Sequence, residues 1–198
     1  MKTKSLFGTS RVFLIGIGAF VGVTANAVVI FDFNTVYTGV LPGGTAPFAT
    51  ATISDVAADT VRLRLDHNAG SADGQFITQL NLNMVSVPSS ISFSNYVNLA
   101  KFNLPITYGE NFFTDAGTQF DMKVQFQTSG AGGGVNRLKP GEFVSVDMTA
   151  TGLTANNFLA YSNPVDGMPP VLALLHMQGI GPDGEESGKL EGVPEPAT

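Results

Sequence analysis

Residues 119–127 read Q-F-D-M-K-V-Q-F-Q, and this stretch alternates strictly between apolar and polar side chains. Every even position from 120 to 126 is apolar, and every odd position is polar. Successive side chains of a β-strand point to opposite faces of a sheet, so this period of two predicts a strand with one buried face. Residues 60–65, T-V-R-L-R-L, repeat the same pattern.

Seven further stretches complete the prediction of an all-β chain when they are added to 119–127. They are residues 28–33, 48–56, 60–65, 75–85, 91–99, 142–150 and 171–180. Turn-forming sequences such as Asp73-Gly74 and Pro182-Asp183-Gly184 separate them. About eight strands with irregular connections predict an antiparallel β-sandwich, jelly-roll-like in its connectivity. Residues 171–180 form the most continuous apolar stretch, which predicts a central strand.

The first 27 residues have the pattern of a secretory signal peptide. A basic start precedes an uncharged apolar run over residues 12–23, and the run is followed by Ala25-Asn26-Ala27. Small residues at Ala25 and Ala27 are typical of a signal cleavage site, and a run of 12 residues is too short to span a bilayer. We therefore expect export, with cleavage after Ala27 and a β-sandwich domain over residues 28–180.

The charge of the predicted mature chain argues against a nucleic-acid partner. Seven Lys and Arg remain after residue 27 against sixteen Asp and Glu, a net charge of −9. An acidic surface repels nucleic acid, and the seven basic residues are scattered along the sequence. The chain has no cysteine, so the exported domain must depend on its apolar core rather than on disulfides.

The last 18 residues lose the strand pattern and become rich in Gly, Pro and Glu. We expect an exposed linker from residue 181 that leads into a sorting tail. The tail consists of Val193, Pro194, Glu195, Pro196, Ala197 and Thr198. This V-P-E-P-A-T sequence resembles the motif that opens the C-terminal sorting region of PEP-CTERM proteins.

The resemblance implies a location and a processing partner. In PEP-CTERM proteins an apolar membrane helix follows the motif, and an exosortase processes the tail. A transient membrane anchor is therefore expected beyond Thr198. Many members belong to Gram-negative bacteria that produce exopolysaccharide or biofilm, which implies a secreted or cell-surface location. The motif covers six residues and says nothing about what the β domain does.

Residue types that carry catalysis do not form a recognisable pattern in this sequence. Its two histidines, His67 and His176, lack the spacing of a metal-binding pair, and no G-x-S-x-G sequence is present. Acidic residues fall mostly in turns, where Asp favours the local backbone geometry. We therefore expect a protein that is not an enzyme.

Calcium is the one cofactor for which the sequence offers candidate ligands. Asp66, Asn68 and Asp73 supply three oxygen-bearing side chains within residues 66–74, and calcium binds oxygen ligands. Their spacing is not that of an EF-hand, and an ordinary polar turn is the alternative interpretation.

Three functions remain open from the sequence. The first is a non-catalytic, structural or adhesive component of the cell surface or extracellular matrix. The second is a carbohydrate-binding module, calcium-assisted or not, in which Tyr37, Tyr96, Tyr108 or Tyr161 meets an extracellular polysaccharide. The third is a secreted hydrolase, which would need two carboxylates that converge in a cleft.

Overall fold

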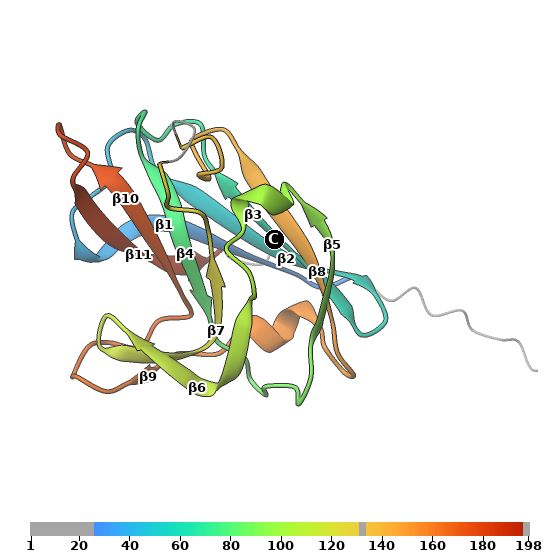
Figure 1. Ribbon diagram of the computed structural model, residues 1–198. Coiled ribbons are helices and arrows are strands. Elements are labelled where there is room, and N and C mark those ends of the chain that lie inside the picture. The colour runs from blue at the N-terminus through green and yellow to red at the C-terminus, as the bar shows by residue number, and fades with distance from the viewer. Residues whose placement is uncertain (1–25, 131–133, 196–198) are drawn as a thin grey trace, which may run out of the picture.

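The computed structural model describes residues 26–130 and 134–195, and these form one antiparallel β-sheet structure (Figure 1). The strands follow the order β5-β8-β3-β2-β1-β11-β10-β4-β7-β6, with β9 paired to β7. In chain order they are β1 (Val28–Gly39), β2 (Ala49–Ala57), β3 (Thr60–His67), β4 (Phe76–Leu82), β5 (Ser92–Val97), β6 (Thr107–Asp115), β7 (Thr118–Gln125), β8 (Phe143–Thr149), β9 (Asn163–Pro164), β10 (Ala173–Ile180) and β11 (Glu186–Pro194).

The sheet curls on itself so that its two halves enclose a single main core (Figure 1). The edge strands β5 and β6 come together through aromatic side chains. The Phe93 and Tyr108 ring centroids lie 5.9 Å apart, and the backbone N–H of Ile91 donates to the Tyr108 hydroxyl at 2.8 Å. The two edges of the sheet therefore meet beside one apolar interior.

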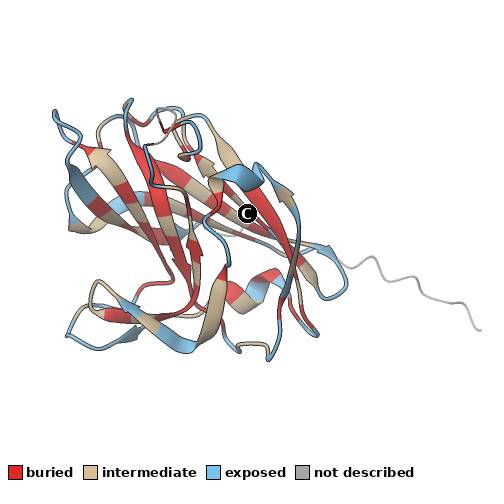
Figure 2. Ribbon diagram, in the orientation of Figure 1, coloured by how far each residue is buried: buried red, intermediate tan, exposed pale blue. Residues whose placement is uncertain are grey.

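Alternation along the strands explains which side chains fill that interior. In β3 the buried residues Val61, Leu63 and Leu65 alternate with two arginines that face outward. Buried residues run along the middle of the sheet, whereas exposed residues gather in the turns and along β6 (Figure 2). Because a residue's face is set by its register, the core is specified wherever the period of two is unbroken.

All eight strands expected from the sequence are present, and the antiparallel all-β class is confirmed. β10 lies between β11 and β4, as its continuous apolar pattern predicted. The jelly-roll connectivity is not confirmed by this strand order. The only helical elements in the described part of the chain are two short 3-10 turns, η1 (Leu99–Lys101) and η2 (Ala155–Phe158). No helix among these residues is long and apolar enough to cross a membrane.

The expectation of an exposed linker from residue 181 was wrong, because residues 186–194 of this segment form strand β11. It lies between β1 and β10, and Leu190 is fully buried. Two of its glycines face crowded surroundings: a Cβ on Gly188 would collide with the carbonyl oxygen of Val40, and one on Gly192 would lie 2.9 Å from Cε1 of Phe33. The glycines that made the sequence resemble a loop are required by close packing.

The hairpin of β6 and β7 extends beyond the main sheet as an arm over residues 109–120. Between Tyr108 and Phe113 the β6–β7 pairing is interrupted, and β9 pairs with the far end of β7. The arm covers a second, smaller core formed by Phe120, Val171 and Leu174.

One carboxylate attaches the tip of the arm to the sheet. Asp115 accepts hydrogen bonds from the amides of Gln79 at 3.0 Å and Asn81 at 2.9 Å, both on β4, and it pairs with Lys189 on β11. Asp115 is the last residue of β6, so this contact holds the end of the arm against the outer face of β4 and β11.

Candidate functional site

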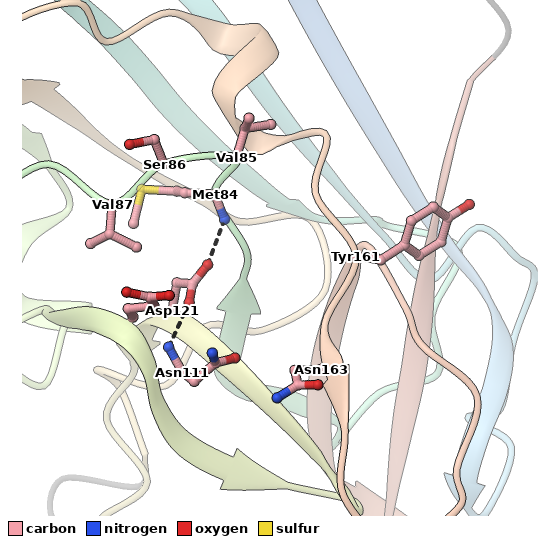
Figure 3. A pocket seen from close by; sticks show the side chains of 9 residues that line it. Met84, Val85, Ser86, Val87, Asn111, Asp121, Tyr161 and Asn163 are labelled. Carbon is pink, nitrogen blue, oxygen red and sulfur yellow. Dashed lines mark hydrogen bonds between the residues drawn. The ribbon is translucent and has the colours of Figure 1, made fainter.

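A pocket of about 540 Å³ opens where the arm leaves the main sheet (Figure 3). This volume lies within the range of small-ligand sites. Its walls come from three segments that are distant in sequence: the connection after β4, the interrupted part of the β6–β7 pairing, and the segment around β9. The lining residues are Met84, Val85, Ser86, Val87, Glu110, Asn111, Asp121, Tyr161 and Asn163.

Asp121 fixes the floor of the pocket. One of its carboxylate oxygens accepts the backbone N–H of Met84 at 2.9 Å, and the other accepts the backbone N–H of Asn111 at 2.8 Å (Figure 3). Asn111 has a φ of 47°, a left-handed conformation that Asn tolerates better than most residues. Asp121 therefore joins the connection after β4 to β6 and holds both walls in place.

The third wall is tied to the connection after β4 by a backbone hydrogen bond. Val85 donates its N–H to the carbonyl oxygen of Asn157 at 2.7 Å, and Asn157 lies in η2, a few residues before Tyr161. At the other end of this wall, the side-chain amide of Asn163 donates to Oε1 of Gln119 at 2.8 Å. The three walls of the pocket are thus connected to one another and to β7.

The pocket offers polar groups suited to a hydroxyl-rich ligand. Ser86 provides a hydroxyl, Asn111 and Asn163 provide amides, and Glu110 and Asp121 provide carboxylates. Tyr161 is 67% exposed at the edge of the pocket, and its ring points away from Asp121 and Asn111 (Figure 3). An exposed tyrosine offers an apolar ring face together with a polar hydroxyl.

Of the four tyrosines named from the sequence, only Tyr161 lines this pocket. Tyr37 donates its hydroxyl to the carbonyl oxygen of Pro169 at 2.7 Å. Burial, followed by the charge of Glu191, raises its pKa. Tyr108 binds Ile91, and the Tyr96 ring packs edge-on against Phe102 with centroids 5.2 Å apart. These three side chains hold the fold together.

The calcium candidates make contacts of other kinds. Both oxygens of Asp66 accept from the guanidinium of Arg64, at 2.6 and 2.7 Å. The amide nitrogen of Asn68 donates to the carbonyl oxygen of Pro47 at 2.8 Å, and Asp73 is exposed in the turn before β4. Within the part of the chain that the structure describes, no group of three His, Asp or Glu residues is arranged to hold a metal ion.

The two histidines lie in different environments. His67 is 1% exposed and its Nδ1 lies 3.0 Å from the carbonyl oxygen of Leu138, while its Nε2 has no hydrogen-bond partner. Burial lowers the pKa of His67. His176 is half-buried on β10 opposite Lys189, and burial together with that charge lowers its pKa.

The predicted sorting motif begins inside the sheet rather than after it. Val193 pairs with Asp32 and Pro194 with Phe31, both on β1, and the backbone N–H of Glu195 donates to the carbonyl oxygen of Ile30 at 3.0 Å. Proline has no backbone N–H to donate within a sheet. β10 pairs with β11 only as far as Gly192, so no carbonyl oxygen of β10 needs a donor at Pro194. Pro196, Ala197 and Thr198 lie outside the described residues.

At the other end of the domain, β1 begins at Val28, directly after the predicted cleavage residue Ala27. The Ala27 backbone N–H donates to the carboxylate of Asp55 at 3.1 Å. Residues 1–25 of the predicted leader, Ala25 included, lie outside the described residues.

Comparison with known proteins does not point to a function for this site. No family model, curated protein or solved structure matches this chain. The sequence alone did not reveal the pocket, because Met84, Asn111 and Tyr161 on its three walls are 27 and 50 residues apart along the chain, in segments without regular alternation. Nothing local marks Asp121, because the alternation of β7 places it among the outward-facing polar residues, although it is only 8% exposed.

Proposed function

We propose that this chain is a non-catalytic protein exported to the cell surface or extracellular matrix of a Gram-negative bacterium. An exosortase would sort it, and its role would be structural or adhesive within exopolysaccharide or biofilm. The single observation that carries this proposal is the V-P-E-P-A-T sequence at residues 193–198. The basic and apolar N-terminal segment that ends at Ala27 supports export independently.

The test of sorting uses the native gene with an epitope in the exposed β10–β11 turn. We expect the tail to be processed in the native host and to remain unprocessed in a strain that lacks exosortase. Replacing Glu195 and Pro196 with alanine should abolish processing, whereas Glu185→Ala, a matched change in the exposed turn, should not. Equal processing with and without exosortase would refute the sorting proposal.

The pocket favours a second function, which is binding of polysaccharide within that matrix. Sugars combine hydroxyl groups with apolar ring faces, and the pocket combines amides, carboxylates and a hydroxyl with the exposed ring of Tyr161. Asp121 holds these groups in position through backbone hydrogen bonds, so the site is formed before a ligand arrives.

The test of this second function is affinity electrophoresis of the purified protein in gels that contain the host's exopolysaccharide. We expect retardation that Tyr161→Ala reduces by about fivefold in affinity, since stacking of an aromatic ring contributes about 1 kcal/mol. Leu41→Ala, which shortens an exposed apolar residue in the β1–β2 connection, is the matched control. Equal retardation of the Tyr161 and Leu41 variants would exclude this pocket as the site.

A further inference from the structure

The charge of the pocket restricts the class of sugar that it can accept. Glu110 and Asp121 are both acidic, and none of the nine lining residues is Lys, Arg or His. Glu110 is exposed, while Asp121 is buried. The predicted mature chain adds to this field with its net charge of −9. The pocket is therefore a region of negative potential.

We infer that the pocket binds a polysaccharide of amino sugars that carry free amines, an inference that rests on the proposed binding of polysaccharide. A protonated amine has three N–H donors and no acceptor, which matches the carboxylate of Glu110 and the amide oxygens of Asn111 and Asn163. The neutral hydroxyls of the same sugar would form hydrogen bonds with the remaining amide groups and with the hydroxyl of Ser86. Uronic-acid polymers would bring like charges together in the pocket, which disfavours them.

Two carboxylates differ in what they contribute to this selectivity. Both oxygens of Asp121 already accept backbone hydrogen bonds, so replacing Asp121 would displace the walls of the pocket. Glu110 lies in the interrupted part of the β6–β7 pairing, between Tyr108 and Phe113, where no ladder partner depends on it. Glu110→Gln therefore removes one charge with little change of shape, which makes it the informative variant.

The experiment is isothermal titration of the purified protein with three hexasaccharides: glucosamine with free amines, its N-acetylated form, and galacturonic acid. We expect the free-amine form to bind about tenfold more tightly than the acetylated form, and the acidic form not to bind. Glu110→Gln should weaken binding of the free-amine form about fivefold and leave the acetylated form unchanged. The preference should shrink as the ionic strength rises to about 0.15 M.

Glu185→Gln is the matched control for non-specific attraction between a polycation and an acidic protein, because it removes the same charge in an exposed turn. Equal losses from Glu110→Gln and Glu185→Gln would overturn the inference. If the acetylated or the acidic sugar binds as tightly as the free-amine form or more tightly, the inference is overturned. If Tyr161→Ala also reduces that binding, the proposed binding of polysaccharide is still supported. Absence of binding to all three sugars and to the host's exopolysaccharide would refute both.

Discussion

Gly192 lies at a point where three strands of the central sheet leave no room for a side chain. A Cβ there would lie 2.8 Å from Cβ of Ala173 on β10 and 2.9 Å from Cε1 of Phe33 on β1. The Phe33 ring is fully buried, so it occupies the volume that a larger residue on β11 would need. The glycine thus allows a large aromatic side chain into the core beside it.

Gly192→Ala is expected to lower the free energy of unfolding by about 1–3 kcal/mol, since overpacking displaces well-packed neighbours. Urea denaturation followed by fluorescence or circular dichroism measures this change. Gly130→Ala is the control, because the nearest heavy atom to a Cβ at Gly130 is Nη2 of Arg137 at 3.8 Å.

A second variant separates collision from loss of backbone freedom. Phe33→Leu shortens the neighbouring side chain, so the double variant with Gly192→Ala should lose less stability than the sum of the two single changes. Strict additivity would contradict the packing explanation.

Among the elements, the arm formed by β6 and β7 depends on a few contacts at its tip. Asp115 accepts from Gln79 and Asn81 and pairs with Lys189, so one carboxylate satisfies three donors on two strands. The side chains of Asp115 and Lys189 are 14% and 25% exposed, which limits screening by water.

Asp115→Ala is expected to loosen the arm. Amide hydrogen exchange in peptides covering residues 107–120 should accelerate, and the free energy of unfolding should fall by about 1–3 kcal/mol because three donors lose their acceptor. Asp183→Ala, in the exposed β10–β11 turn, is the control and should change neither quantity. Unaltered exchange in the arm of the Asp115 variant would show that the second core alone holds it.

The elements also differ in how far the sequence predicted them. β3 and β7 keep a strict period of two, and they were found at nearly their observed bounds. β6, which reads T-Y-G-E-N-F-F-T-D, was missed because an interruption between Tyr108 and Phe113 breaks the alternation. β11 was missed because its inward positions are Gly188, Leu190 and Gly192, so only one large apolar residue marks its buried face. In both strands, contacts with distant segments outweigh the local pattern.

The candidate site was less predictable than the fold for a related reason. Tyr161 was named from the sequence among possible sugar contacts, but nothing local distinguishes it from the three tyrosines that hold the fold together. Asp121, Asn111 and Met84 meet only because the arm folds back beside the connection after β4. Such a meeting depends on the tertiary arrangement of irregular segments, which no local periodicity encodes.

At the scale of the whole molecule, the histidines and carboxylates with shifted pKa values all have lowered values, which favour the folded state at neutral pH over acidic pH. Burial lowers the pKa of His67 and of His176. A hydrogen bond from Arg62 lowers the pKa of Asp147. Burial alone would raise the pKa of Glu142, but hydrogen bonds from Lys101 and the Lys139 backbone and the charges of both lysines outweigh it, so the pKa is lowered.

We therefore expect stability to fall steadily as the solution is acidified. Where a pKa is lower in the folded state, the unfolded state binds more protons, and protonation favours unfolding. The histidine contribution is lost as the pH falls below about 6.5, and the carboxylate contribution follows below about 4. Urea denaturation at several values between about pH 8 and pH 2 measures both steps.

His67→Gln should reduce the slope of stability against pH in the upper part of this range. His176→Gln is the comparison, and its effect should be smaller because its ring is less deeply buried. A slope that both variants leave unchanged would assign the acid sensitivity to other groups.

The position of β11 has a mechanical consequence for any protein that is tethered through its tail. Glu195 is bonded to β1, and the strand that precedes it is flanked by β1 and β10 over most of its length. Tension applied through Glu195 would act directly on β11 in the middle of the sheet. The hydrogen bonds of β11 to β1 and to β10 would resist this tension together. A domain pulled through Glu195 would transmit the force directly to its own core.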